Sequence, residues 1–135
     1  MNHADAPVRA LVIASPHIEH ILSGQKTWEM RSKTCKIRGT IGLIRKGSGK
    51  VVGLVDITGV RGPLTRDELM ENLDKLHGTR EQIYDPAFAK WNFAWILAQV
   101  RPLKMPVAYV HPKGAVGWVT LDENVRAQIS AQMHT

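Results

Sequence analysis

The sequence has a single cysteine, Cys35, and no hydrophobic run long enough to cross a lipid bilayer. One cysteine excludes an intrachain disulfide and a metal site built from several cysteines, and it fits a reducing cytoplasm. Residues 1–7 lack the charged and then apolar pattern of a secretion signal. We therefore expect a cytoplasmic protein without a membrane partner, and the sequence shows no metal-ligand set or cofactor fingerprint.

Repeats, linkers and low-complexity segments are also absent from the 135 residues. This length fits one domain with its own core, and the hydrophobic content of 44% is ordinary for a globular protein. We expect a single domain over residues 1–135, with flexible ends at residues 1–8 and 131–135.

Acidic residues are missing from one long segment, residues 30–55. Seven basic residues lie there: Arg31, Lys33, Lys36, Arg38, Arg45, Lys46 and Lys50. The remainder of the chain holds 11 of the 18 basic residues and all 12 acidic ones, so the net charge of +6 has a local origin. Such a concentration is typical of a surface that binds a polyanion. It predicts RNA, a nucleotide or another phosphate-bearing partner, with Lys33, Arg45, Lys46 and Lys50 as contacts.

Short apolar strands alternate with amphipathic helices along the chain. We expect strands over residues 9–15, 39–46, 50–60, 91–103 and 115–121, and helices over 16–23, 65–77 and 122–133. Residues 79–88 fit either a short helix or an ordered loop. Residues 105–114 are expected to form a loop or a broken strand, because Pro106 and Pro112 argue against a regular central strand there. This order of elements predicts an α+β fold, a small and partly open mixed β-barrel with two to four peripheral helices.

Several residues indicate where the helices begin and end. Ser15 is a candidate N-cap for the first helix, and Gly24 is expected to end it in the left-handed conformation. Thr65 and Glu68 have the spacing of a capping box. His17 and His20 are too close in sequence for an i, i+4 metal pair, and we interpret both as surface residues.

The segment 23–31 brings two cations, an anion and an indole close together after a turn glycine. If it is extended, alternation places Lys26, Trp28 and Met30 on one side, and Thr27, Glu29 and Arg31 on the other. Glu29 and Arg31 would then hold each other in place. A guanidinium beside a carboxylate suits recognition of a flat polar ligand such as a nucleobase or its phosphate. The alternative is an edge strand with a solvated ion pair, which contributes little.

Aromatic side chains amount to only 6% of the residues, and several gather near residue 93. Trp91, Phe93 and Trp95 alternate onto one face, which is typical of a core stripe. An exposed Trp91 would instead be a platform on which a base stacks. Tyr109 and His111 would point the same way if the chain is locally extended.

Taken together, these motifs resemble the ASCH domain, a branch of the PUA-like barrel superfamily. The residues that carry the likeness are Gly24-x-Lys26-Thr27-x-Glu29-x-Arg31, a following basic strand pair with Gly39, Trp95, Val100, Pro102-Leu103, Pro106, Tyr109, Gly114-Ala115-Val116 and Trp118. The likeness spans nearly the whole chain, roughly residues 9–121. It implies a PUA-like barrel of about six strands, with the first motif in a cleft beside a basic surface.

The resemblance also implies a function. Proteins of this superfamily typically bind RNA, and several relatives recognise modified bases. One bacterial branch hydrolyses the acetyl amide of acetylcytidine with a lysine, a threonine three residues later and a distant glutamate. Here the lysine falls on Lys26, but Glu29 occupies the threonine position, and Thr27 directly follows the lysine instead.

Three function classes follow. The first is RNA or nucleotide binding, including recognition of a modified base, with the ligand contacts Lys26, Trp28, Glu29, Arg31, Lys33, Arg45, Lys46, Lys50, Trp91, Tyr109 and His111. The second is a hydrolase, either a ribonuclease or an acetylcytidine amidohydrolase-like enzyme, in which Lys26 and Glu29 form a general acid/base pair. The third is a protein-docking module of a transcription or RNA-processing complex, with an apolar patch near Trp91 and Phe93.

Overall fold

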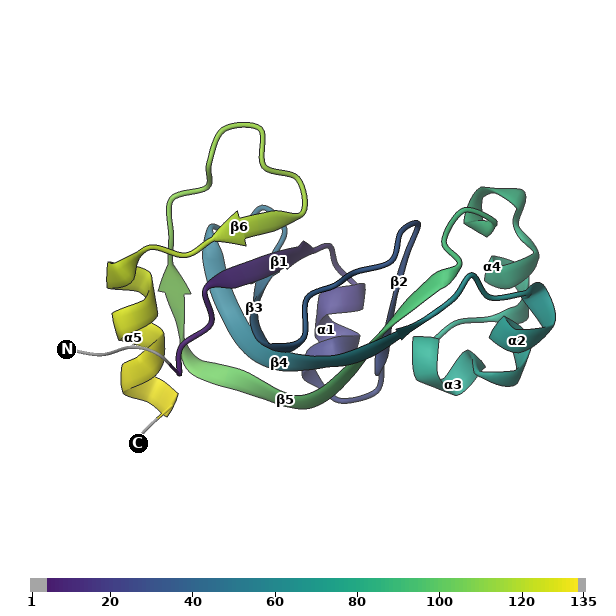
Figure 1. Cartoon of the computed structure of the whole chain (residues 1–135), viewed down its shortest axis with the longest axis horizontal. Helices are drawn as coiled ribbons and strands as arrows, with labels where there is room; N and C mark the ends of the chain where they lie inside the picture. Colours follow the sequence, from purple (N-terminus) through teal and green to yellow (C-terminus); the bar gives the residue numbers. More distant parts are fainter. Residues whose placement is uncertain (1–4, 134–135) are drawn as a thin grey trace.

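The computed structural model describes residues 5–133, which form a curled six-stranded sheet with helices at both ends (Figure 1). The strands are β1 (Arg9–Ile13), β2 (Trp28–Arg31), β3 (Gly39–Arg45), β4 (Lys50–Arg61), β5 (Phe93–Ala108) and β6 (Trp118–Thr120). Their order in the sheet is β2-β5-β4-β3-β1-β6, and β1 and β3 are parallel whereas the other pairs are antiparallel. The predicted α+β class and mixed, partly open six-stranded barrel are confirmed.

The helices are more numerous than the two to four expected. The structure has α1 (His17–Leu22), α2 (Arg66–Glu71), α3 (Leu73–Leu76), α4 (Arg80–Tyr84), a 3-10 turn η1 (Pro86–Phe88) and α5 (Glu123–Met133). The helix expected over residues 65–77 is interrupted at Asn72, whose backbone leaves the helical region and whose Nδ2 donates to the Glu68 carbonyl at 2.8 Å. Residues 79–88, whose sequence fits either a short helix or an ordered loop, form α4 and η1.

Strand β5 is longer than the sequence predicts, because it continues through Pro102 and Pro106 to Ala108. The expected loop or broken strand over residues 105–114 is therefore wrong as far as Ala108. Strand β2 pairs only with residues 93–96 of β5, so the later part of β5 has strand β4 as its partner on one side alone within residues 5–133. A proline lacks the N–H for a second ladder, and at such an edge that loss is tolerated.

The start of α1 also differs from expectation. Its N-cap residue is Pro16, which makes no side-chain cap, and Ser15 Oγ instead donates to the Glu19 carboxylate. Gly24 follows with a φ of +84°, as predicted for the left-handed residue that ends the helix. This turn directs the chain toward β2.

Three clusters of buried side chains hold the molecule together. One lies between α1 and the inside of the curled sheet, a second lies under α5, and a third lies under α2–α4. Val125 and Ile129 of α5 are buried, as predicted for the terminal helix. Ala6 is buried as well, and α5 continues to Met133. Of the ends expected to be flexible, residues 1–4 and 134–135 lie outside the described residues.

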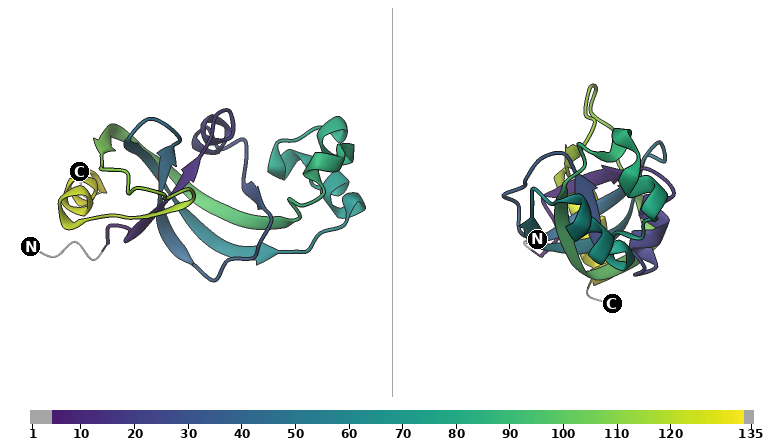
Figure 2. Two further views of the ribbon diagram at one scale, coloured as in Figure 1. Left: turned by 90° about the horizontal axis from the view of Figure 1, so that it is seen from above. Right: turned by 90° about the vertical axis from the view of Figure 1, so that its right-hand side faces the viewer.

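Helices α2–α4 belong to an insertion between β4 and β5, which we call the helical insertion (residues 64–91). It lies at the end of the sheet opposite α5 (Figures 1 and 2). Thr65 and Glu68 form the predicted capping box, and Thr79 and Gln82 form a second. The insertion contacts the residue just before β2, because the backbone N–H of Thr27 donates to the Lys75 carbonyl at 2.8 Å. No helix within residues 5–133 is long and apolar enough to span a membrane.

Candidate functional site

A cavity of about 480 Å³ opens between the C-terminal end of β1, strand β2 and the helical insertion. We call it the first cavity. Its charged and aromatic lining residues are Lys26, Glu29, Arg31, Lys46, Phe88 and Trp91. Two histidines, His17 and His77, also line it, and Val116 of the β5–β6 loop contributes an apolar side chain. Segments far apart in the sequence thus meet around one concave space.

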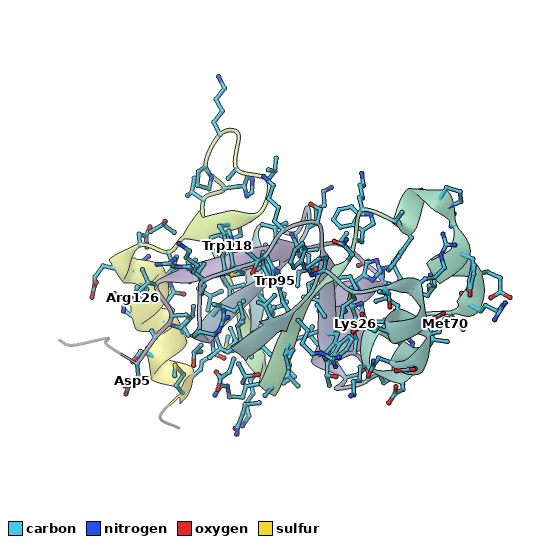
Figure 3. All side chains as sticks on the ribbon, turned by 45° about the vertical axis from the view of Figure 1, so that its right-hand side comes forward. Asp5, Lys26, Met70, Trp95, Trp118 and Arg126 are labelled. Atoms are coloured by element: carbon cyan, nitrogen blue, oxygen red, sulfur yellow. The ribbon has the colours of Figure 1, made fainter. Side chains whose placement is uncertain are left out.

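Lys26 is buried beside this cavity, with only 5% of its surface exposed (Figure 3). It lies before β2 begins, in a turn where its backbone N–H donates to the His20 carbonyl at 3.0 Å. Its Nζ donates to the carbonyl of Leu76 at 2.8 Å. Burial lowers the pKa of Lys26, and the nearby Glu29 carboxylate partly opposes that change.

The separation of Lys26 from Glu29 onto opposite faces is expected only for an extended segment, and Lys26 lies outside the strand. Strand alternation applies only from Trp28 onward, because residues 24–27 form a turn outside the strand. Lys26 and Glu29 therefore line the same cavity.

Glu29 and Arg31 lie on one face of β2 and form an ion pair, as their spacing predicts. Arg31 Nε and Nη2 both donate to Glu29 Oε2, at 3.0 and 2.9 Å. Nη2 also donates to the Val12 carbonyl at 3.3 Å, and the guanidinium lies 5.4 Å from the centre of the Trp95 ring. Within residues 5–133, no donor reaches Glu29 Oε1. The pair is thus fixed in place while one carboxylate oxygen stays available.

His17 is exposed, as expected for a surface residue, and it also lines the first cavity. Partial burial there lowers the pKa of His17, and the positive charge of Lys26 acts in the same direction. His20 contacts His77 of the helical insertion, with ring centroids 4.1 Å apart. Helix α1 and the insertion therefore approach each other across this side of the cavity.

Trp28 packs beneath the helical insertion and does not line the first cavity. It is 3% exposed, and the centre of its ring lies 5.2 Å from Arg61 Cζ and 5.4 Å from Lys75 Nζ. Trp91 does line the cavity, is half-buried and has Lys90 Nζ at 5.1 Å from its ring. Trp95 belongs to the core and donates its Nε1 hydrogen to the backbone carbonyl of Lys33 at 2.9 Å. The aromatic stripe is therefore divided between core and cavity.

The remaining candidate contacts lie outside the lining of the first cavity. Tyr109 Oη and His111 Nδ1 are 2.8 Å apart, and His111 Nε2 lies 2.7 Å from the Ala115 carbonyl, so these side chains brace the β5–β6 loop. Arg45 Nε lies 3.7 Å from Glu19 Oε1. Lys50 opens β4. Of the basic candidates, Lys26, Arg31 and Lys46 line the cavity.

Gln82 and Phe88 of the helical insertion also line the cavity, and sequence reasoning did not predict either of them as a site residue. His77 adopts a φ of +53° at the end of α3, and Gln82 belongs to the second capping box. The Thr79-x-x-Gln82 spacing was the available signal, since it marks the start of a helix after a glycine. No group of three or more His, Cys, Asp or Glu within residues 5–133 is arranged to hold a metal ion.

Comparisons with known proteins agree with this architecture. A family model described as the ASCH domain matches residues 11–107. The crystal structure of ASCH from Zymomonas mobilis has a TM-score of 0.68 at 14% identity, covering 91% of this chain and 93% of that chain. A tyrosine-to-phenylalanine mutant of that protein has a TM-score of 0.67 at 15% identity, covering 91% of this chain and 96% of that chain. At these identities the likeness concerns the fold alone, and no curated protein matches the chain.

Proposed function

This chain belongs to the ASCH domain family, a PUA-like fold associated with RNA binding, and from that premise we propose that its first cavity binds a single base of an RNA strand or of a free nucleotide. The observation that carries the proposal is the burial of Lys26 and Glu29, at 5% and 7% exposure, in the wall of one cavity. Burying charged groups costs free energy. Such groups in a cavity therefore indicate a ligand that uses them.

The polar groups of the cavity match the edge of a base. A lysine ammonium has three donors, of which Lys26 gives one to the Leu76 carbonyl. Glu29 Oε1 offers an acceptor for an exocyclic amine or a ring N–H, while Arg31 keeps the carboxylate in position through Oε2. A donor and an acceptor side by side complement a base that presents an acceptor and a donor.

The apolar walls suit the flat faces of a base. Trp91 and Phe88 line the same cavity, and stacking of a base on an aromatic ring contributes about 1–3 kcal/mol. A volume of about 480 Å³ lies within the usual range for sites that hold small ligands. Lys46 at the rim adds a positive charge for the phosphate that accompanies the base.

A binding assay with Glu29→Gln tests the proposal. Nucleosides, nucleotides and short RNAs, with and without base modifications, are screened by thermal shift, and the affinity of each hit is measured by calorimetry. Glu29→Gln keeps the shape of the side chain but removes its charge, and a hydrogen bond to a charged group contributes about 1.5–3 kcal/mol. We expect its affinity to fall by about 10- to 100-fold.

Glu71→Gln is the matched control, because Glu71 is an exposed glutamate of α2 outside the cavity. It should bind like the unmodified protein. Equal affinities for both variants, or no stabilisation by any member of the screen, would contradict the proposal.

A hydrolase remains the second candidate, and the specific observation in its favour is the lowered pKa of Lys26 beside Glu29. A lysine that releases its proton more readily acts as a general base nearer neutral pH. The same screen decides between the two functions if the bound acetylated nucleosides and structured RNAs are analysed for products. Turnover that is lost in both Lys26→Ala and Glu29→Gln, with the fold intact by circular dichroism, would establish the enzyme.

A further inference from the structure

A second cavity, of about 390 Å³, opens at the N-terminal end of β1. Its charged lining residues are Arg9, Lys36 and Arg38, and its lining contains no aspartate or glutamate. Thr40 adds a hydroxyl group. A concave surface with three cations and no carboxylate attracts an anion.

The three cations are not neutralised by neighbouring acids. The ion pairs within residues 5–133 involve other basic residues than Arg9, Lys36 and Arg38. Asp56 is bonded to Thr40, with the Thr40 hydroxyl donating to Oδ1 at 2.7 Å, but Arg101 Nη2 donates to the same oxygen at 2.7 Å. Asp56, the carboxylate that is bonded to the lining residue Thr40, is thus already paired with Arg101.

Arg38 is also held in a defined place. Its Nη1 donates to the carbonyls of Cys35 and Ile37, at 2.8 and 2.9 Å, and the Ile37 N–H donates to Cys35 Sγ at 3.3 Å. Within residues 5–133, the other donors of the guanidinium make no hydrogen bond and can meet a partner. A fixed guanidinium is suited to a phosphate, because its planar fork matches two phosphate oxygens.

The two cavities lie at opposite ends of β1 and are joined by the β2–β3 connection, residues 32–38. At one end Arg31 lines the first cavity and donates to the Val12 carbonyl. At the other end Lys36 and Arg38 share the second cavity with Arg9. Strand β1 itself spans about 13 Å at the usual rise per residue. The connection from β2 to β3 can be followed in Figure 1, and it contains Lys33, Lys36 and Arg38.

We propose that the second cavity binds a backbone phosphate of the same single-stranded RNA whose base enters the first cavity. This inference rests on the proposed function. A base held in a cavity is unpaired, so its strand is single at that point and must leave along the protein surface. Arg31 lines the first cavity and Arg9 and Lys36 line the second, so positive charge lies at both ends of β1, and single strands follow positively charged surfaces.

The test measures the salt dependence of binding for an RNA of about four nucleotides, the lower end of the site sizes of small single-strand-binding domains. Each phosphate contact on a single strand contributes about 0.7 to the slope of log affinity against log salt. We expect Lys36→Gln to reduce this slope by about 0.7, and the double variant Arg9→Gln/Lys36→Gln to reduce it by about 1.4. Neither side chain makes a hydrogen bond or ion pair within residues 5–133 that the fold would lose.

Two controls separate this inference from the proposed function. Lys104→Gln removes an exposed lysine of β5 that lines neither cavity, and it should leave the slope unchanged. An oligonucleotide of the same length that lacks its bases probes the phosphate site alone. Its affinity should respond to Lys36→Gln and stay unchanged in Glu29→Gln.

A slope equal to that of the unmodified protein in the double variant would overturn the second phosphate site, whatever Glu29→Gln does. Loss of the Glu29→Gln effect on base-containing RNA, with the Lys36→Gln effect retained on both oligonucleotides, would overturn base binding and leave the phosphate site standing. Failure of both oligonucleotides to bind the unmodified protein would overturn both proposals.

Discussion

At the scale of single residues, the unusual feature is a lysine and a glutamate that are both buried beside one cavity. Lys26 is tied to the Leu76 carbonyl, and Glu29 is tied to Arg31. Replacing such buried ions by apolar residues of similar size is often neutral or stabilising in proteins. Their presence is thus poor support for stability, and it agrees better with a role in binding a polar ligand.

The pH dependence of stability tests the state of Lys26. Burial lowers its pKa below the ordinary value of 10.5. Between the lowered pKa and 10.5, the unfolded chain holds a proton on Lys26 that the folded chain has released, so the free energy of unfolding increases with pH through this window. Below the window both states hold the proton, and the full cost of burying the charge is present.

We therefore expect Lys26→Met to remove this increase. Denaturation by urea, measured in steps from about pH 7 to about pH 10, gives the free energy of unfolding of the variant relative to the unmodified protein. That relative stability should be highest near neutral pH and should decrease as the pH rises. Lys104→Met, at an exposed position, should show a constant difference. A constant difference for Lys26→Met as well would show that the charged form of Lys26 is not penalised by the fold.

At the scale of elements, local patterns predicted what local interactions decide. The capping box at Thr65, the left-handed Gly24 and the buried face of α5 with Val125 and Ile129 all depend on residues near in sequence. The extension of β5 through Pro106 was missed, because it depends on which strands pair with β5 at that point. Pairing of distant segments is invisible to a pattern read along the chain.

The same limit applies to the candidate site. The ion pair of Glu29 with Arg31 followed from a spacing of two residues in a strand. The placement of Lys26 beside Glu29 did not follow, because it needs the turn before β2 and the carbonyl of Leu76, fifty positions away in the sequence. His77 and Phe88 reach the cavity only because the helical insertion folds back over β2.

Gly62, at the junction between β4 and the helical insertion, gives a prediction at this scale. Gly62 leaves β4 with a φ of +149°, and a Cβ atom there would lie 2.8 Å from the Asn92 carbonyl oxygen and 2.6 Å from Phe93 Cδ1. The backbone of Asn92 is held there by the Leu64 N–H at 2.8 Å, so it cannot move away without cost. We expect Gly62→Ala to lower the free energy of unfolding by about 1–3 kcal/mol.

Gly59→Ala is its matched control within β4. A Cβ atom at Gly59 meets only Ile96 Cδ1, at 3.8 Å, which is an ordinary contact distance. Urea denaturation of the two variants should give a clear loss for Gly62→Ala and a smaller change for Gly59→Ala. Equal changes in the free energy of unfolding would show that glycine is not specifically required at position 62.

At the scale of the whole molecule, the positive charge of the segment 30–55 is divided between two cavities. The basic residues of the segment 30–55 reach the first cavity through Arg31 and Lys46 and the second cavity through Lys36 and Arg38. Arg45 lies against Glu19, and its charge is partly compensated. Some of these basic residues thus line a cavity where a ligand can reach them, whereas Arg45 already faces a carboxylate. The sequence alone did not show this difference.

This unevenness predicts different salt responses for charges that are equal in sequence. Lys46 lines the first cavity and takes part in no ion pair within residues 5–133, so Lys46→Gln should reduce the salt slope of RNA binding by about 0.7. Lys104→Gln removes the same charge from a part of β5 outside both cavities, and the slope should stay the same. The measurement is the affinity for a short single-stranded RNA between about 50 and 200 mM salt. If both variants reduced the slope equally, the net charge of +6 would attract RNA to the protein surface as a whole. The proposal that RNA binds at the two cavities would then be contradicted.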